Sequence, residues 1–290
     1  MKNFLMTMLL CLLALGKVSA QSESRVFDAK TLKSQILNED RKYAVYLPAG
    51  YNNSERSYPI LYLLHPAGPG GTVANQQSWL YYGELKQYLD KAIANGEIAP
   101  MVVVTPDANF GNVRRSYYND ADGKFNFEDF FFKEFMPYIE KTYRVRTDKG
   151  SRAIVGASAG GGGAVYYALH HPEMFAVCGG LAAAIREWKD ANMQNRYPGI
   201  SEDKLKEWFK DYDAFSIFRN MTDKDKNQFK LFIACGDDDG LSVNNGDLHA
   251  LLNKIGYKHE YRISEGAHNW TYWRSITPEI MKFVSDAFKM

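Results

Sequence analysis

The sequence has few cysteines and no excess of either charge. Its 290 residues include 3 cysteines, and 35 basic residues nearly balance 34 acidic residues, for a formal net charge of +1. This balance offers no electrostatic footprint for nucleic acid or an anionic membrane, so neither is an expected partner. A Pro-, Ser- or Gly-rich linker, a charge block and an internal repeat are also lacking. With 46% hydrophobic and 24% charged residues, the chain is expected to form one globular domain.

The first twenty residues, MKNFLMTMLLCLLALGKVSA, differ from the rest. A basic residue precedes an apolar run that ends in small residues at Ala20, which is typical of a secretory signal peptide. The apolar run is too short and too early to predict a membrane span. Cys11 lacks the small preceding residue of a lipidated cysteine. We therefore expect a signal peptide over 1–20, cleavage after Ala20, and a secreted or periplasmic domain over 21–290.

The two cysteines beyond this segment, Cys178 and Cys235, each lie in an apolar run with the character of a buried strand. An exported protein is able to oxidise such a pair. However, neighbouring parallel strands rarely offer the geometry of a disulfide, so buried free thiols are expected.

Short apolar runs alternate with segments of helical spacing. The runs cover 43–48, 58–64, 101–105, 152–156, 175–182, 229–235 and 259–264. The helical segments cover 76–94, 127–143, 158–171, 244–256 and 273–289. This alternation predicts an α/β fold with a mostly parallel central sheet and helices on both faces. The segment 183–222 breaks the rhythm with polar sequence, and we expect it to form an insertion over the active-site end of the sheet.

The sequence GASAGGGGA at 156–164 follows one of the apolar runs and opens a helical segment. Glycine inside a helix costs about 1 kcal/mol relative to alanine, so helix propensity does not explain this run. Gly156, Ser158 and Gly160 form a G-x-S-x-G pattern in the strand, turn and helix context of a nucleophile elbow. Gly161–Gly163 would then let the helix approach its neighbours closely.

Two further strand ends carry residues suited to catalysis. Asp237, Asp238 and Asp239 follow one apolar run, and His268 follows the next. Ligands bind beyond the carboxyl ends of parallel strands, so these side chains are expected near Ser158. The chain order of serine, aspartate and histidine is that of an α/β-hydrolase triad. The residues alone do not decide among the three aspartates.

An oxyanion hole needs main-chain N–H donors near the nucleophile. The sequence LLHPAGPGG follows the apolar run at 58–64 and is the candidate loop. Pro66 has no N–H, so Ala67 or Gly68 is expected to donate, together with Ala159, the residue after the nucleophile.

These features resemble the putative-esterase family of the α/β-hydrolases, which includes the feruloyl and acetylxylan esterases of carbohydrate esterase family one, S-formylglutathione hydrolases, enterochelin esterases and mycolyltransferases. The resemblance rests on YAVYLPAGYNNSERSYPILYLLH, FKEFMPYIEKTYRV, AIVGASAGGGGA, ACGDDDGL and EGAHNWTYWR, and extends over about residues 26–288.

The resemblance implies an α/β-hydrolase fold and a set of roles. Ser158 would be the nucleophile, His268 the base and Asp239 the acid, with no cofactor and no metal. The chain departs from the family at Pro66 and at Ala267, where glycine is usual.

The resemblance and the expected export together suggest a substrate. The first expectation is a serine esterase that removes feruloyl or cinnamoyl groups from a plant polysaccharide such as arabinoxylan. Acetylxylan esterase is the nearest alternative, and enterochelin-type hydrolysis or carbohydrate binding without catalysis on the same fold come next. The expected export argues against a glutathione thioester as the substrate, because that compound is cytosolic. Aromatic side chains predicted to contact substrate are Trp79, Tyr117, Trp188 and Trp270.

One remaining pattern, DADGKFNFED at Asp120–Asp129, echoes a calcium-binding loop. Its first ligand position would be Tyr118, and the flanking helices of an EF-hand are missing, so we expect a polar turn before a helix and no calcium.

Overall fold

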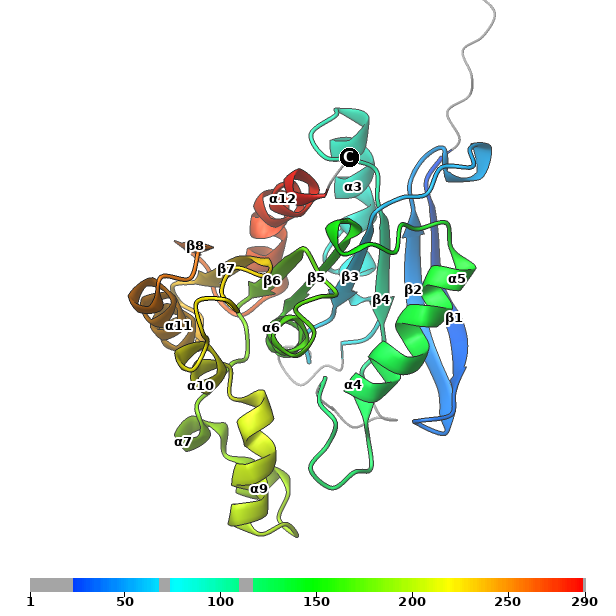
Figure 1. Ribbon diagram of the computed structural model, residues 1–290. Helices are drawn as coiled ribbons and strands as arrows, with labels where there is room; N and C mark the ends of the chain where they lie inside the picture. Colours follow the sequence, from blue (N-terminus) through cyan, green and yellow to red (C-terminus); the bar gives the residue numbers. More distant parts are fainter. Residues whose placement is uncertain (1–22, 68–73, 110–116, 289–290) are drawn as a thin grey trace, which may run out of the picture.

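The computed structural model describes residues 23–67, 74–109 and 117–288. Its centre is an eight-stranded sheet in the order β1-β2-β4-β3-β5-β6-β7-β8 (Figure 1). The strands are β1 (Arg25–Ser34), β2 (Glu39–Leu47), β3 (Ile60–Leu64), β4 (Val102–Pro106), β5 (Arg152–Ala157), β6 (Val177–Leu181), β7 (Lys230–Gly236) and β8 (His259–Ser264). Strand β2 runs antiparallel to β1 and β4, and the other neighbours are parallel. The prediction of a mostly parallel sheet is confirmed.

Helices cover both faces of the sheet, as predicted. One apolar core includes residues of α4 (Phe127–Phe130), α5 (Met136–Thr142), α6 (Ala159–His170) and α11 (Ser242–Ile255). The other core includes residues of α3 (Leu85–Ala94) and α12 (Trp270–Ala287). In Figure 1, α3 and α12 lie on one side of the sheet, and α4, α5 and α6 lie on the other.

The prediction differs from the structure in two places. The segment 76–94 forms two helices, α2 (Ser78–Tyr81) and α3, because the chain turns between them at Gly83 and at Glu84, whose φ is +51°. Strand β1 was not predicted. It lies at the edge of the sheet and most of its side chains are at least partly exposed, so it lacks the continuous hydrophobicity of a buried strand.

The segment 183–222 folds into short helices rather than an extended loop. These are α7 (Trp188–Ala191), α8 (Met193–Arg196), α9 (Glu202–Phe209), a 3-10 turn η5 (Lys210–Tyr212) and α10 (Ala214–Arg219). Similar 3-10 turns lie at Tyr51–Asn53 and Lys149–Ser151, and a π-helical turn, Phe131–Phe135, joins α4 to α5. Across the part of the chain that the structure describes, no helix combines the length and hydrophobicity needed to cross a membrane.

The buried cysteines are free thiols, as predicted. Cys178 lies beside Leu231 in the register of β6 and β7, whereas Cys235 lies four residues farther along β7. At about 3.3 Å per residue, this offset places the two thiols too far apart for a disulfide.

Candidate active site

The turn between β5 and α6 holds Ser158 in a strained conformation. Its φ is +56° and its ψ is −119°, a region that non-glycine residues rarely occupy. The Ser158 N–H donates to the carbonyl of Leu181 at 2.8 Å, and the Ser158 carbonyl accepts from the N–H groups of Gly162 and Ala184 at 3.0 and 2.9 Å. These bonds on both sides of the residue fix the turn and maintain the strain.

The glycines on either side of Ser158 allow the turn to close. A Cβ on Gly156 would lie 2.2 Å from the carbonyl oxygen of Gly160, and a Cβ on Gly160 would lie 2.5 Å from the carbonyl oxygen of Leu64. Both neighbours are main-chain atoms, so neither position accepts a side chain without movement of the backbone.

The rest of the glycine run brings α6 close to its neighbours. A Cβ would lie 3.1 Å from Ala183 Cα at Gly161, 2.9 Å from the Ala184 carbonyl oxygen at Gly162, and 2.6 Å from Tyr117 Cβ at Gly163. The expected close approach is therefore present, and it involves the chain after β6 and Tyr117.

Ser158, His268 and Asp239 lie in a hydrogen-bonded row. The His268 Nε2 atom is 2.8 Å from Ser158 Oγ, and Nδ1 is 2.7 Å from Asp239 Oδ2. Because Nδ1 faces a carboxylate, it carries the ring proton, which leaves Nε2 as the acceptor for the serine hydroxyl. The Asp239 side chain is fully buried, and its Oδ1 accepts the Leu241 N–H at 2.8 Å.

The other two aspartates have different positions. The Asp237 carboxylate accepts hydrogen bonds from the N–H groups of Gly266 and Asp238, each at 3.0 Å. Asp238 is exposed. Of the three, only Asp239 forms a hydrogen bond with His268 among the described residues.

A cavity of about 410 Å³ opens beside the nucleophile. Ser158, Ala159 and Ala67 contribute to its wall, so both described candidates for the oxyanion hole lie at the cavity. Gly68 is outside the described residues. The remaining wall residues are Tyr118, Tyr166, Ala184, Arg186, Ala191, Met193, Arg196 and Phe209. Six of these, from Ala184 to Phe209, lie in the segment 183–222, and none was predicted as a site residue. The sequence of this segment contains no motif that would identify these residues as part of a cavity wall.

The predicted aromatic contacts require correction. Trp79 is fully buried, and its Nε1 donates to the Leu64 carbonyl at 3.1 Å. Tyr117 is buried as well, and its hydroxyl donates to the His65 carbonyl at 2.9 Å. The prediction that these two contact substrate is wrong, because both support the candidate oxyanion loop from within the core.

Trp188 and Trp270 are partly exposed but neither lines the cavity. The Trp188 ring packs on Phe209, with centroids 5.6 Å apart. Trp270 contacts the rings of Tyr82 and Trp273. Their role in substrate binding stays a prediction.

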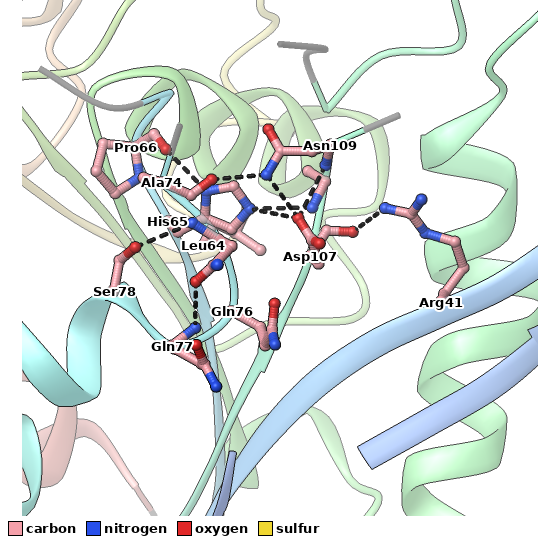
Figure 2. A network of polar contacts seen from close by, with 12 residues as sticks. Arg41, Leu64, His65, Pro66, Ala74, Gln76, Gln77, Ser78, Asp107 and Asn109 are labelled. Atoms are coloured by element: carbon pink, nitrogen blue, oxygen red, sulfur yellow. Dashed lines mark hydrogen bonds and ion pairs between the residues drawn. The ribbon is translucent and has the colours of Figure 1, made fainter. Parts of the chain in front are cut away.

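His65, which the sequence did not single out, anchors the candidate oxyanion loop (Figure 2). The ring is buried at the end of β3. Its Nε2 accepts the N–H of Ala108 at 3.0 Å, so its proton is on Nδ1, which lies 2.7 Å from the Pro66 carbonyl oxygen. Asn109 extends this network by donating to the carbonyl of Ala74 at 2.6 Å. The imidazole thus joins the loop after β3 to the loop after β4.

In the turn at Asp120–Asp129, which resembles a calcium-binding loop in sequence, polar side chains form hydrogen bonds within the protein. The Asp120 carboxylate is buried and accepts the hydroxyl of Tyr197 at 2.7 Å, and the Asn119 side chain accepts the N–H of Asp129 in the first turn of α4. Among the residues described, no three acidic, histidine or cysteine side chains are grouped to hold a metal ion.

A mostly parallel sheet with a strained serine after its central strand β5 is the architecture of the α/β-hydrolase class. The family model described as "Putative esterase" matches residues 34–283. The chain belongs to this esterase family.

Known relatives agree with this assignment. Over 243 residues the chain is 30% identical to an endo-1,4-beta-xylanase/feruloyl esterase of Xylanibacter ruminicola, an alignment that covers 79% of this chain and 27% of that protein. A solved ferulic acid esterase is 31% identical with a TM-score of 0.80, covering 92% of this chain and 100% of the other. A CE1 ferulic acid esterase from Anaeromyces mucronatus in complex with ferulic acid shares the fold, with a TM-score of 0.68 at 19% identity and coverage of 94% and 95%.

Proposed function

We propose that this chain hydrolyses carboxylic esters through an acyl-enzyme on Ser158. His268 takes the proton from Ser158 Oγ as this oxygen attacks the ester carbonyl, and then delivers it to the leaving alcohol. Asp239 holds the imidazole in the required tautomer and stabilises the imidazolium. Water then attacks the acyl-enzyme, with His268 again acting as the base. The single observation that supports this mechanism best is the row of contacts at 2.8 and 2.7 Å.

The N–H groups of Ala159 and of the loop at Ala67 would stabilise the negative charge on the tetrahedral oxygen. Ala159 begins a twelve-residue helix, so its N–H has no acceptor within the helix, and the helix dipole adds positive potential at that point. Pro66 has no N–H to donate. This leaves Ala67, or Gly68 beside it, as the second donor.

The proposed substrate is a feruloyl or cinnamoyl ester of a plant polysaccharide or oligosaccharide, and we propose that the protein meets it after export. The similarity to a xylanase/feruloyl esterase and to a ferulic acid esterase supports this choice. A cavity of about 410 Å³ beside Ser158, with Tyr118, Tyr166 and Phe209 in its wall, has aromatic surface for a phenolic ring.

Hydrolysis of methyl ferulate, acetylated xylan and a short-chain aryl ester tests the proposal. Ser158→Ala should abolish turnover of every ester that the wild type hydrolyses, whereas Ser201→Ala, at an exposed serine of the insertion, should have no effect. Asp239→Asn should lower kcat by about 10⁴, and Asp238→Asn, at the exposed neighbour, should change it little. Thermal unfolding checks that the variants remain folded. Retained activity in Ser158→Ala would refute the mechanism. Preference for acetylated xylan over methyl ferulate would show that the substrate is an acetyl ester rather than a feruloyl ester. Binding to xylan without hydrolysis of any ester would indicate a carbohydrate-binding protein.

A further inference from the structure

Two neighbouring tyrosines at the end of α2 are exposed. Tyr81 and Tyr82 are 62% and 59% exposed, more than any other aromatic side chain in the part of the chain that the structure describes. The Tyr81 hydroxyl donates to the carboxylate of Asp28 in β1. The Tyr82 ring instead contacts the partly exposed ring of Trp270, with centroids 5.9 Å apart and planes inclined by 31°. We call Tyr82 and Trp270 the aromatic platform.

The protein holds the aromatic platform in place from below. The Trp270 ring contacts two fully buried rings edge to face, Trp79 at 5.2 Å and Trp273 at 4.9 Å between centroids. The main chain of Tyr82 is joined to α12, because its carbonyl accepts a hydrogen bond from Arg274 at 2.8 Å. A ligand on this surface would therefore meet aromatic rings that are already supported, which lowers the entropy lost on binding.

The aromatic platform is connected to the catalytic histidine through one buried ring. Trp273, which contacts Trp270, also contacts the His268 ring, with centroids 5.2 Å apart. His268 and Trp270 are only two residues apart in the chain, on either side of the residue that caps α12. The aromatic platform therefore lies on the His268 side of the nucleophile.

The cavity beside Ser158 lies on the other side. Its described wall includes Tyr118, Tyr166 and Phe209, which belong to the core that contains α6. Trp270 packs instead against the core of α3 and α12, on the opposite face of the sheet. The cavity and the aromatic platform thus flank the edge of the sheet that carries Ser158.

The proposed mechanism determines which part of an ester reaches each side. His268 delivers a proton to the leaving alcohol, so the alcohol oxygen has to lie beside its Nε2 atom. The acyl group then occupies the cavity beside Ser158. The alcohol part extends toward the His268 side, where the aromatic platform lies.

A saccharide suits this surface. Sugar rings have apolar C–H groups on their faces and hydroxyl groups around their edges. Tyrosine and tryptophan match this pattern, because each has a large apolar face and one polar group at its edge. Exposed aromatic side chains that are held in place are also typical of interaction sites.

We propose that Tyr82 and Trp270 bind a sugar ring in the alcohol part of the ester by stacking. The ligand is a neutral saccharide chain, such as the sugar part of a feruloylated arabinoxylan. This inference rests on the proposed function, because it assumes that Ser158 and His268 cleave an ester.

Two esters with the same acyl group test the role of the alcohol part. A feruloylated arabinoxylan oligosaccharide is compared with methyl ferulate, which has no sugar. Tyr82→Ala should reduce the ratio of kcat/KM for the oligosaccharide to kcat/KM for methyl ferulate by about three- to tenfold, as expected for one lost stacking contact. The fall should appear as a higher KM for the oligosaccharide, because stacking away from the reacting atoms stabilises bound substrate and transition state equally. Trp270→Leu, which keeps an apolar side chain against Trp79 and Trp273, should reduce the same ratio.

Tyr81→Ala is the matched control, because Tyr81 is as exposed as Tyr82 but its hydroxyl is bonded to Asp28. It should leave the ratio unchanged. An unchanged ratio in Tyr82→Ala, or an equal fall in Tyr81→Ala, would overturn the inference. Sedimentation velocity adds a further check: a wild-type dimer that Tyr82→Ala converts to monomers would show that this surface binds a second copy of the chain instead of a sugar.

A binding measurement separates the failure of this inference from the failure of the proposed function. The same oligosaccharide, after removal of its ferulate, is titrated into the Ser158→Ala protein in a calorimeter, which requires no turnover. Binding that is weakened in the Ser158→Ala/Tyr82→Ala protein supports the aromatic platform, and equal binding by the two proteins or no binding argues against it. Absence of hydrolysis of both esters by the wild type, in contrast, counts against the proposed function.

Discussion

The side chain of Asn245 forms hydrogen bonds with the main chain of Ala183 in both directions. Its Nδ2 donates to the Ala183 carbonyl at 3.0 Å, and the Ala183 N–H donates to Oδ1 at 3.2 Å. The amide is completely buried. Ala183 lies between Ala182, whose φ is +43°, and Ala184, whose N–H donates to the Ser158 carbonyl. Helix α11 therefore fixes the main chain beside the nucleophile, although Asn245 takes no part in the chemistry.

Replacement of Asn245 by alanine should destabilise the protein by about 2–4 kcal/mol, because it leaves the buried Ala183 N–H without a partner and opens a small cavity. The Ala183 carbonyl would keep only the hydrogen bond from the Ile185 N–H. Urea unfolding monitored by fluorescence measures the loss. Asn244→Ala, at the partly exposed neighbouring residue, should cost less than about 0.5 kcal/mol. Equal stability of the two variants would contradict this account of Asn245.

Gly160 and Gly246 both lie in helices, yet replacement by alanine should have opposite effects. At Gly160 the new Cβ would lie 2.5 Å from the Leu64 carbonyl oxygen and 2.6 Å from that of His65. The main chain that leads to the candidate oxyanion loop would have to move, at a cost of about 1–3 kcal/mol. At Gly246 the nearest atom is the Tyr261 hydroxyl at 3.7 Å, so alanine should stabilise α11 by up to about 1 kcal/mol.

Thermal unfolding of the two glycine variants measures both effects, and turnover of an aryl ester adds a second test. Gly160→Ala should lose activity as well as stability, whereas Gly246→Ala should retain full activity. If both substitutions stabilise the protein, helix propensity outweighs the close contact at Gly160.

The elbow and the sheet could be predicted because their physical causes are local. Buried parallel strands require continuous apolar runs, and the close contacts at Gly156 and Gly160 require glycine at fixed distances from Ser158. The order of strand ends along the chain then brings Asp239 and His268 to the same edge. None of these inferences needed knowledge of a distant contact.

Other features depend on contacts that the sequence does not encode locally. The sequence does not distinguish Trp79 and Tyr117 from aromatic residues that bind a substrate. Only the packing of α2 and α6 shows that these two side chains are buried. His65 directly follows the apolar run at 58–64 and belongs to no motif of its own, and its role depends on Ala108, which is 43 residues away. The part of the cavity wall that α7 to α9 form depends equally on how these helices pack.

His65 should act as a positioning residue for the loop at Ala67. His65→Leu removes both the donor to the Pro66 carbonyl and the acceptor for the Ala108 N–H, so kcat should fall by about ten- to a hundredfold with little change in KM, since oxyanion stabilisation is specific to the transition state. His65→Gln keeps an acceptor for Ala108 and should restore part of kcat. Steady-state kinetics on an aryl ester measures the effect. A leucine variant that is folded and has wild-type kcat would exclude this role.

His170 connects the insertion to the rest of the protein through a pH-dependent contact. Its Nδ1 lies 2.6 Å from a Glu128 carboxylate oxygen and its Nε2 lies 2.5 Å from the Asp211 carbonyl oxygen of η5. Both partners are acceptors, so the ring makes both bonds only when it is doubly protonated. Burial lowers the pKa of His170, but the hydrogen bond and charge of Glu128 outweigh this effect, and the pKa is raised above its ordinary value of 6.5.

The carboxylate partner is shifted in the opposite direction. Burial raises the pKa of Glu128, but hydrogen bonds from His170, His171 and Tyr212 lower it to about 2, from an ordinary value of 4.5. A raised histidine pKa contributes stability that is complete below 6.5 and is lost as the pH rises through the folded-state pKa. A lowered carboxylate pKa contributes stability that is complete above 4.5 and is lost as the pH falls toward about 2. The pair should therefore stabilise the protein most between these two ordinary values.

His170→Gln should cost about 1–2 kcal/mol at pH 5.5, and less as the pH rises above the raised pKa of the histidine. Urea unfolding of wild type and variant from pH 5 to pH 9 measures the difference. His249→Gln provides a control of opposite sign, because burial, followed by the charge of His259, lowers the pKa of His249. The wild-type His249 destabilises the fold as the pH falls below about 6.5, so its replacement should increase stability at pH 5.5 and have little effect at pH 9. A cost for His170→Gln that is the same at every pH would show that the ring contributes by packing alone, and that its charge does not stabilise the contact between η5 and α6.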